Sequence, residues 1–348
     1  MKRQLLGVAA ILLSISTYAQ DNPLWMRYCA ISPDGTTIAF TYKGDIYTVP
    51  STGGRASQIT TNPAHDTKPI WSPDGKKIAF ASDRMGSMDI FEVNKEGGIP
   101  KRLTTHSGNE TPVAYKDAGH ILFLANIMPT AEDAQFPSGQ FQQVYEVNTE
   151  GGRPILFSSM PMEDISINHT GNTLLYHDKK GYEDPWRKHH TSSITRDIWL
   201  CSLNGNRTFR KQTTFNGEDR TPVWASDDKS FYYLSEEKGS FNIFKRDIDG
   251  NTSKQITNHT KHPVRFLSAA SNGTLCYGYD GEIYTVKEGA IPQKVQISIV
   301  TDKNDKDLIR QIKRSGATEI SLSPDAKEIA FVLRGDVYLS LIHISEPT

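Results

Sequence analysis

The 348-residue sequence has few cysteines, almost no net charge and no long apolar run. Its three cysteines, Cys29, Cys201 and Cys276, have no CxxC spacing, so we expect buried free thiols and no disulfide framework or metal site. Lys and Arg number 39 against 40 Asp and Glu, which gives no global charge to attract nucleic acid. The apolar run Leu5–Ile15 is too short to span a bilayer comfortably. Neither a nucleic-acid partner nor stable membrane insertion is therefore expected.

Motifs for catalysis and cofactor binding are also missing. The sequence contains no GxSxG elbow, no HExxH pair and no P-loop. His189 and His190 have no carboxylate at a metal-ligand spacing, and the stretch Asp247–Gly250 lacks the further ligands of an EF-hand. We interpret both as surface features, and we expect no cofactor, no metal and no catalytic residue in this chain.

The first residues have the pattern of an export signal. Lys2 and Arg3 precede the apolar run, and Thr17–Ala19 supplies a small-residue cleavage site before Gln20. We therefore expect residues 1–19 to be a signal peptide and the mature protein to be periplasmic.

The sequence does contain an internal repeat, first legible in the stretch Ile31–Thr60. Ser32–Gly35 reads SPDG, in which proline presets the turn and glycine accepts the left-handed conformation of a tight hairpin. Apolar and polar residues then alternate with the period of two that is typical of strands, between two further turn signals. The unit is predicted to be a four-stranded antiparallel meander of about 40 residues.

The landmarks of this unit recur along the chain. The turn residues are Asp34, Asp74, Asp117, Thr170, Asp227, Asn272 and Asp325. A polar, apolar, aromatic triplet that opens each third strand begins at Asp45, Asp89, Gln143, Asp197, Asn242, Glu282 and Asp336. Fourth strands that end in Thr or Ser are expected at Ser57–Thr60, Lys101–Thr104, Arg210–Thr214, Ser253–Thr257 and Lys294–Ser298. This period predicts an all-β protein, a β-propeller of four-stranded antiparallel blades.

The spacing of the repeats suggests how the chain is divided. We interpret residues 20–300 as a six-bladed propeller, the charged stretch 301–315 as a linker, and 316–339 as the first strands of a second, truncated propeller. Residues 340–348 interrupt the blade pattern and resemble a translated sequencing adaptor, so we expect a non-native tail. The alternative is one seven-bladed propeller in which the charged stretch is a loop.

The blade consensus resembles the propeller repeat shared by TolB, prolyl-oligopeptidase-type peptidases and tricorn proteases. The longer stretches Asn22–Pro50, Gly181–Leu200, Lys261–Leu267 and Tyr277–Gly289 are similar to the N-terminal part of exported tricorn-like serine proteases of Bacteroidetes. The resemblance implies a serine-type endopeptidase whose PDZ and peptidase domains lie outside this sequence, and it allows a homo-oligomer. It also implies that this region binds or guides peptide or unfolded protein substrate. A TolB-like protein-binding propeller and the propeller of a prolyl-oligopeptidase-like peptidase are the alternatives.

Two insertions between second and third strands mark a candidate binding face. They are Asn126–Gln143 in the third blade and His177–Asp197 in the fourth, and the shared connection type predicts that both lie on one rim. Aromatic and Arg side chains dominate the energetics of interfaces. The candidate substrate- or partner-binding residues are therefore Phe136, Tyr182, Trp186, Arg187 and Arg196. Packing of these side chains against the propeller is the alternative interpretation.

Overall fold

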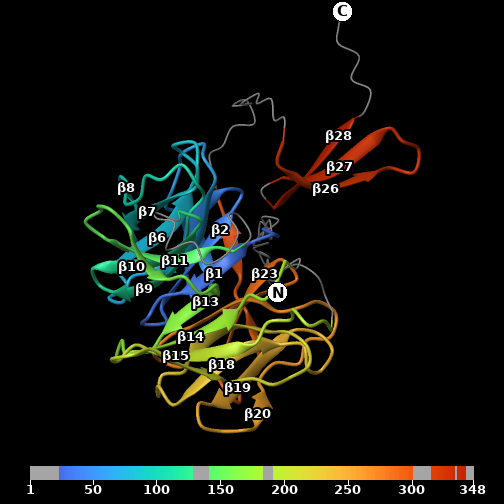
Figure 1. Cartoon of the computed structure of the whole chain (residues 1–348). Coiled ribbons are helices and arrows are strands. Elements are labelled where there is room, and N and C mark those ends of the chain that lie inside the picture. The colour runs from blue at the N-terminus through green and yellow to red at the C-terminus, as the bar shows by residue number, and fades with distance from the viewer. Residues whose placement is uncertain (1–22, 128–140, 183–190, 301–314, 334, 342–348) are drawn as a thin grey trace, which may run out of the picture.

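The computed structural model describes residues 23–127, 141–182, 191–300, 315–333 and 335–341 (Figure 1). The expected signal peptide, residues 301–314 of the expected linker and residues 342–348 of the expected tail lie outside the described residues. Within them the regular structure is entirely β: six four-stranded antiparallel sheets, one of which gains a fifth strand, and one three-stranded sheet. None of the described segments is a helix long and apolar enough to cross a membrane.

The strands follow the predicted order of four per blade. Blades one and two contain β1 (Arg27–Ile31), β2 (Thr37–Tyr42), β3 (Asp45–Pro50), β4 (Gly54–Gln58), β5 (Asp66–Trp71), β6 (Lys77–Ser82), β7 (Asp89–Asn94) and β8 (Lys101–Arg102). Blades three and four contain β9 (Thr111–Asp117), β10 (His120–Ala125), β11 (Gln143–Asn148), β12 (Ile155–Ser158), β13 (Met162–Ile167), β14 (Thr173–Asp178), β15 (Ile198–Ser202) and β16 (Thr208–Lys211). Blades five and six contain β17 (Asp219–Trp224), β18 (Ser230–Ser235), β19 (Asn242–Asp247), β20 (Ser253–Gln255), β21 (Arg265–Ala269), β22 (Leu275–Tyr279), β23 (Glu282–Val286) and β24 (Gln293–Lys294). The remaining strands are β25 (Ile297–Ile299), β26 (Ala317–Leu322), β27 (Glu328–Leu333) and β28 (Asp336–Leu341).

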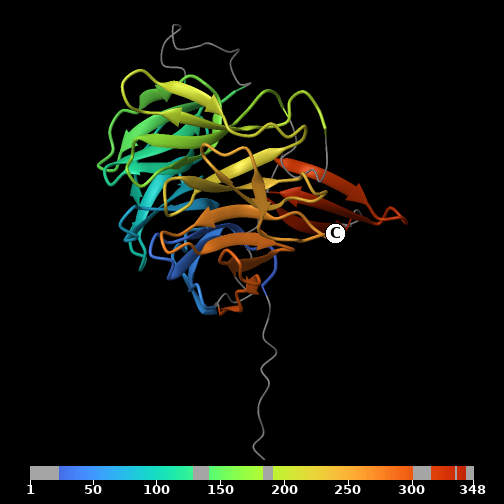
Figure 2. The same cartoon turned by 90° about the horizontal axis from the view of Figure 1, so that it is seen from below.

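Six hydrophobic clusters join the blades into a ring. Each cluster combines buried side chains of two successive blades, as a propeller requires. The cluster that closes the ring combines Cys29 and Phe40 of the first blade with Cys276 and Ile283 of the sixth. Figures 1 and 2 show the orange sixth blade beside the blue first blade. The ring therefore closes after six blades, as in the first of the two predicted arrangements.

Closure of the ring uses a strand that the sequence interpretation assigned wrongly. We expected Lys294–Ser298 to be the fourth strand of blade six, but that strand is β24 and ends at Lys294. β25 instead pairs in parallel with β4 of blade one, with Ile297 opposite Gly54. Val295 and Ile297 are both buried, so the alternation of buried and exposed residues continues from β24 into β25, although the two strands pair with different neighbours. Periodicity reports which face is buried and cannot report which strand is the neighbour.

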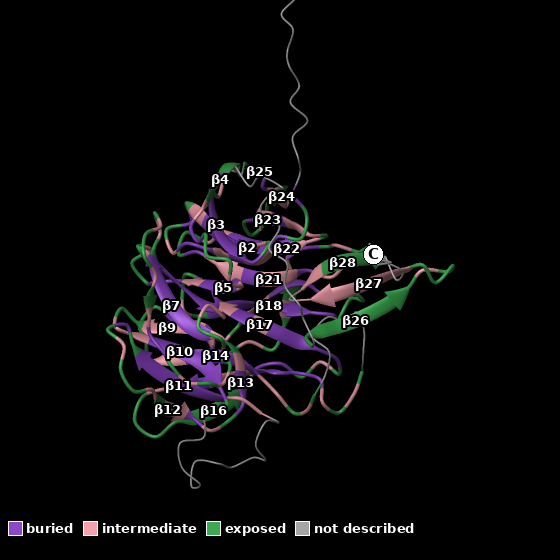
Figure 3. Ribbon diagram, turned by 90° about the horizontal axis from the view of Figure 1, so that it is seen from above, coloured by how far each residue is buried: buried purple, intermediate pink, exposed green. Residues whose placement is uncertain are grey.

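The three-stranded sheet β26–β28 lies outside the ring (Figure 1). All residues of β26 are exposed, and the apolar side chains of Ile320, Leu322, Val337 and Leu339 are 59–69% exposed. The ring strands β10 and β18 are buried by comparison (Figure 3). The sheet thus has the strand pattern of a blade without the neighbouring blades that would cover it.

The repeated turn and threonine residues have clear structural roles. Asp34 Oδ1 accepts a hydrogen bond from the Thr36 N–H, and Asp74 Oδ1 accepts one from the Lys76 N–H. Four threonines accept a hydrogen bond, 2.9–3.0 Å long, from the N–H of the first apolar residue in the third strand; they are Thr60, Thr104, Thr213 and Thr257. These threonines follow the fourth strands rather than ending them, because the fourth strands stop two residues earlier. The predicted landmark is therefore a side-chain hydrogen bond that joins the two outer strands of the blade.

Candidate functional site

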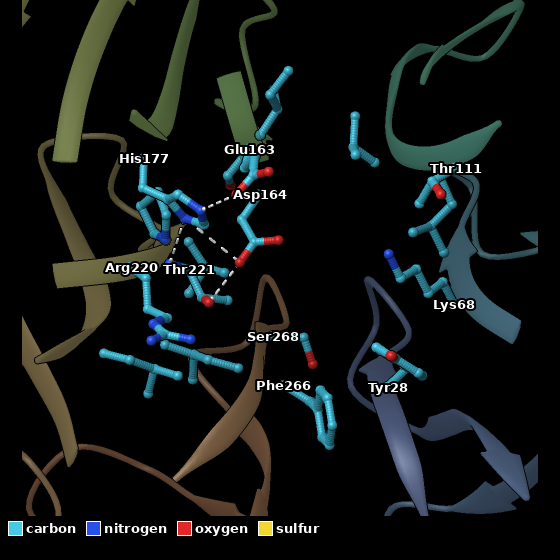
Figure 4. A pocket seen from close by; sticks show the side chains of 18 of the residues that line it. Tyr28, Lys68, Thr111, Glu163, Asp164, His177, Arg220, Thr221, Phe266 and Ser268 are labelled. Atoms are coloured by element: carbon cyan, nitrogen blue, oxygen red, sulfur yellow. Dashed lines mark hydrogen bonds and ion pairs between the residues drawn. The ribbon is translucent and has the colours of Figure 1, made fainter. Parts of the chain in front are cut away.

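The first strands of the six blades, β1, β5, β9, β13, β17 and β21, line a cavity of about 530 Å³ in the middle of the ring. All six strands contribute residues to its wall, and we call it the central cavity. Its volume lies within the range of roughly 300–1,000 Å³ that is usual for small-ligand sites. Figure 4 shows polar, charged and aromatic side chains that approach one another from different blades. The cavity is therefore large enough for a short segment of peptide or a small molecule.

A β-bulge in each first strand controls which side chains enter this wall. In every blade two residues of the first strand lie opposite one aromatic residue of the second, where the register shifts. The aromatic residues are buried, and they are Phe40, Phe80, Phe123, Tyr176, Tyr233 and Tyr277. Bulges redirect side chains and are frequent beside functional sites. The repeat thus builds six equivalent positions around one cavity.

Five of the six bulges place a non-glycine residue in the left-handed region. These residues have φ between 48° and 56°, and they are Tyr28, Lys68, Asp164, Thr221 and Phe266. All five line the central cavity. Left-handed backbone at a residue with a side chain costs on the order of 1 kcal/mol, and most at a β-branched residue such as Thr221. Five of the ten non-glycine residues with positive φ in the described part of the chain thus surround this one cavity.

The third blade is the exception, and proline explains it. In blade two, Lys68 and Pro69 lie opposite Phe80 of the second strand. In blade three, Pro112 pairs with Phe123, which corresponds to Phe80, so Pro112 occupies the position of Lys68. The proline ring holds φ near −65°, so this bulge cannot adopt the left-handed conformation.

Acidic and basic side chains form a connected group on the wall of blade four. Glu163 accepts from His177 Nε2 at 3.2 Å and pairs with Lys179 Nζ at 2.7 Å. His177 Nδ1 accepts from the Thr221 N–H at 3.3 Å, which assigns the ring proton to Nε2. Burial would raise the pKa of Glu163, but the hydrogen bond from His177 and the charge of Lys179 outweigh it and hold that pKa well below its usual range. Glu163 is therefore a fixed carboxylate.

A second ion cluster lies behind the wall. Glu218 is fully buried, and its Oε1 lies 2.7 Å from Arg196 Nη1 and 2.8 Å from Arg220 Nη2. Arg196 Nε also lies 3.4 Å from Glu163 Oε2, which links this cluster to the first one. Both guanidinium groups belong to residues that line the cavity. The cluster thus orients two cations of the wall from behind.

The opposite side of the cavity carries Lys68 beside an aromatic pair. Tyr28 and Phe266 contact each other with ring centroids 4.8 Å apart, and Lys68 Nζ lies 5.8 Å from the Tyr28 centroid. Burial lowers the pKa of Lys68, although Asp164 and Glu163 act against this shift. Burial likewise raises the pKa of Tyr28, so its phenol remains a neutral hydrogen-bond donor. This side offers apolar surface, one hydroxyl and one cation.

The structure describes two of the five residues proposed from the sequence. Tyr182 is 93% exposed and lines the cavity, whereas Arg196 lines it as a buried member of the second ion cluster. Gln142 of the third-blade insertion lines the same cavity, so the described ends of both insertions meet there. Phe136, Trp186 and Arg187 lie outside the described residues.

Sequence reasoning missed the left-handed positions, although a faint signal was present. In blades two and five the left-handed residue lies two positions after an Asp and directly before a Pro. These stretches are Asp66–Pro69 and Asp219–Pro222. Blades one, four and six carry no proline there, so the pattern alone does not reveal a repeat. All three cysteines are buried and free, as predicted. Within the described part of the chain, no group of three or more His, Cys, Asp or Glu side chains is placed to hold a metal ion.

Two buried carboxyl groups near the first strands should make stability depend on pH. Burial raises the pKa of Glu110 and the pKa of Asp219 to about 7 each. Hydrogen bonds from hydroxyl groups oppose this shift, from Thr104 to Glu110 and from Ser235 and Thr213 to Asp219. The folded protein then binds these protons more tightly than the unfolded chain, so stability is fully present below about pH 4 and is lost as pH rises through about 7. Each group should account for roughly 2–3 kcal/mol, so between pH 5 and 8 we expect a total loss of about 4–5 kcal/mol in the free energy of unfolding, measured by urea unfolding.

The variant that carries both Glu110→Gln and Asp219→Asn is the control for this pH dependence. Glu163 does not interfere, because its lowered pKa affects stability only below about pH 4.5. The difference in unfolding free energy between wild type and variant should change with pH over this window. A constant difference from pH 5 to 8 would contradict the raised pKa values.

Fold and cavity together define the class: a six-bladed β-propeller whose central cavity is lined by strained, chemically varied side chains. Residues 23–290 match the family model described as the tricorn protease N-terminal β-propeller domain. The chain belongs to this family.

Similar proteins agree with this assignment. The chain is 27% identical over 330 residues to a tricorn protease homolog of Saccharolobus solfataricus, covering 90% of this chain and 28% of the relative. It is 25% identical over 328 residues to the tricorn protease of Thermoplasma acidophilum, covering 91% and 29%. It therefore spans less than a third of the length of these relatives.

Comparison with solved structures supports the fold. The crystal structure of the tricorn protease superposes with a TM-score of 0.68 at 21% identity, covering 91% of this chain and 30% of that one. The structure of puromycin hydrolase superposes with a TM-score of 0.51 at 10% identity, covering 88% and 49%. At these identities the likeness shows the propeller fold alone.

Proposed function

We propose that this chain is the peptide-binding propeller of an exported tricorn-like serine protease, with the catalytic residues supplied by another part of the protein. The observation that carries the proposal is the convergence of five left-handed, non-glycine residues on one cavity. Strain that gathers at one place points to a function there, because glycine would form the same bulges without the strain. The family and the similar tricorn protease homolog support the protease part of the proposal.

The chemistry of the cavity suits a peptide. Tyr28 and Phe266 offer aromatic surface, and Thr221 offers a hydroxyl group on the wall of another blade. Lys68 and Asp164 add charges of opposite sign on different blades. A peptide segment carries apolar side chains, amide donors and acceptors, and charged ends, so it can use each of these groups. Tyr182 at the end of an insertion supplies a further aromatic contact beside the cavity.

The setting of the propeller is part of the same proposal. The basic, apolar and small-residue pattern of residues 1–19 supports a periplasmic location, which N-terminal sequencing of the exported protein would check. PDZ and peptidase domains of the same protein are its proposed partners, and self-association is compatible with this arrangement.

We expect the variant Phe266→Asn of the full 348-residue chain to bind peptides about tenfold more weakly than wild type. Asn tolerates the left-handed conformation, so the change removes the aromatic contact and keeps the backbone. Loss of an aromatic anchor commonly costs more than 1 kcal/mol at an interface. The measurement is fluorescence anisotropy with a fluorescein-labelled tryptic digest of casein.

The matched control is Phe209→Asn on the outer strand β16, where the side chain is 40% exposed and lies away from the cavity wall. This variant should bind like wild type. Equal affinities for all three proteins would mean that the cavity is not the peptide site.

A further inference from the structure

Lys68 differs from the neighbouring cations of the central cavity. Lys179 pairs with Glu163 at 2.7 Å, and Arg196 and Arg220 pair with the buried Glu218. Among the residues that the structure describes, no carboxylate lies within 4.0 Å of Lys68 Nζ. The side chain instead points into the cavity on the side of Tyr28, with Nζ 5.8 Å from the Tyr28 ring centroid (Figure 4). One cation of the wall is therefore available for a ligand.

The left-handed backbone conformation that turns the Lys68 side chain toward the cavity is energetically unfavourable. Lys68 is the first residue of its bulge and has φ of 53°, although a lysine gains nothing from the left-handed region by itself. Its side chain is half-buried, so part of the hydration of the ammonium group is lost. A desolvated ammonium without a counter-ion is unfavourable, and a bound anion would offset that penalty.

The carboxylate on the facing wall is already engaged. Asp164 Oδ2 accepts a hydrogen bond from Thr221 Oγ1 at 2.6 Å, and it lies 3.7 Å from His177 Nδ1. The hydrogen bond from Thr221 holds Asp164 on its own side of the cavity, which leaves the space beside Lys68 for another anion. Asp164 and Glu163 would also repel a doubly charged group such as phosphate more strongly than a singly charged one.

We propose that Lys68 binds a carboxylate group of the peptide ligand, either the C-terminal carboxylate or that of an acidic side chain. The inference rests on the proposed function, which supplies the peptide. A carboxylate carries a single charge that one ammonium group neutralises, and charge-assisted hydrogen bonds of this kind are among the stronger ones. The aromatic rings of Tyr28 and Phe266 beside it would contact the apolar atoms that flank the carboxylate.

Calorimetric titration of the full chain with three peptides tests this site. The probes are acetyl-Ala-Ala-Phe-Leu as the free acid, the same peptide as the C-terminal amide, and acetyl-Ala-Glu-Phe-Leu amide. Wild type should bind at least one carboxylate-bearing peptide about tenfold more tightly than the uncharged amide. The better of the two identifies the source of the carboxylate. The preference should weaken as ionic strength rises.

Three variants assign the preference to Lys68. Lys68→Gln should abolish it, and Lys68→Arg should keep it, since only the charge is common to Lys and Arg. Asp164→Asn should strengthen binding of the acid, because it removes a repelling charge and leaves an oxygen for the Thr221 hydroxyl. Lys76→Gln is the matched control, since Lys76 belongs to the same blade and its side chain is 78% exposed.

The possible outcomes separate the two proposals. If wild type binds all three peptides equally, or if Lys68→Gln keeps the preference, the carboxylate site is wrong while peptide binding stands. If Lys68→Gln fails to fold, Asp164→Asn still decides, because unchanged or weaker binding of the acid contradicts the site. If neither these peptides nor the casein digest bind, the proposed function fails and this inference fails with it.

Discussion

Replacing Glu218 by Ala is expected to lower the free energy of unfolding by about 3–5 kcal/mol. The carboxylate is fully buried between Arg196 and Arg220, at 2.7 and 2.8 Å. Its removal leaves two guanidinium groups in a buried site without their shared counter-ion, which costs far more than the loss of one exposed ion pair. Urea unfolding of the variant and wild type measures the difference.

The control for this variant is Glu150→Ala. Glu150 pairs with Lys101 at 2.8 Å, but its side chain is 84% exposed, so removing the pair should leave the free energy of unfolding almost unchanged. A loss below about 1 kcal/mol in Glu218→Ala would mean that water reaches the buried cluster. Peptide binding by Glu218→Ala should also weaken, because two cations of the cavity wall lose their orientation.

A chain that ends after Lys294 should be much less stable than a chain that ends after Val300. The shorter chain lacks β25, the parallel partner of β4, and loses the buried side chains of Val295 and Ile297. Burial of one such side chain contributes about 1.5–3 kcal/mol, so the expected loss is about 3–6 kcal/mol. The bared edge of β4 should also promote aggregation. Thermal unfolding and light scattering of both chains measure these effects.

The chain that ends after Val300 is the control, and it should keep the thermal stability of the full chain. Of the described strands it lacks β26–β28, whose exposed apolar residues do not belong to the six clusters of the ring. Removal of this sheet should increase solubility, because the sheet exposes both apolar side chains and an unpaired edge. A large fall in melting temperature would instead indicate that β26–β28 stabilise the ring as a seventh blade.

The sequence predicted the blades because the information for them is local. A turn such as Ser32–Gly35 encodes its own geometry through proline and glycine, and alternation encodes the buried face of a strand. The triplets that begin at Asp45 and Asp89 open third strands as expected. Even the recurrent threonine after the fourth strand reports a short-range contact, from Thr60 to the N–H of Ile46 within the same blade. Each of these features involves residues of one repeat.

The site, in contrast, was decided by the tertiary structure. No local preference predicts left-handed backbone at Lys68, Thr221 or Phe266, since these residue types normally avoid it. The bulges exist because each first strand must bend around the ring axis while an aromatic residue of the second strand fills the space behind it.

The closure of the ring was decided in the same way. β25 and β4 are more than two hundred residues apart, and the buried Glu218 joins Arg196 and Arg220 from different blades. The sequence of each repeat specifies the strands of one blade. The number of blades in the ring and the side chains that line the cavity depend on contacts between repeats. Only the packed ring brings those residues together, because the repeat period of a sequence does not specify packing geometry or ion pairs between distant repeats.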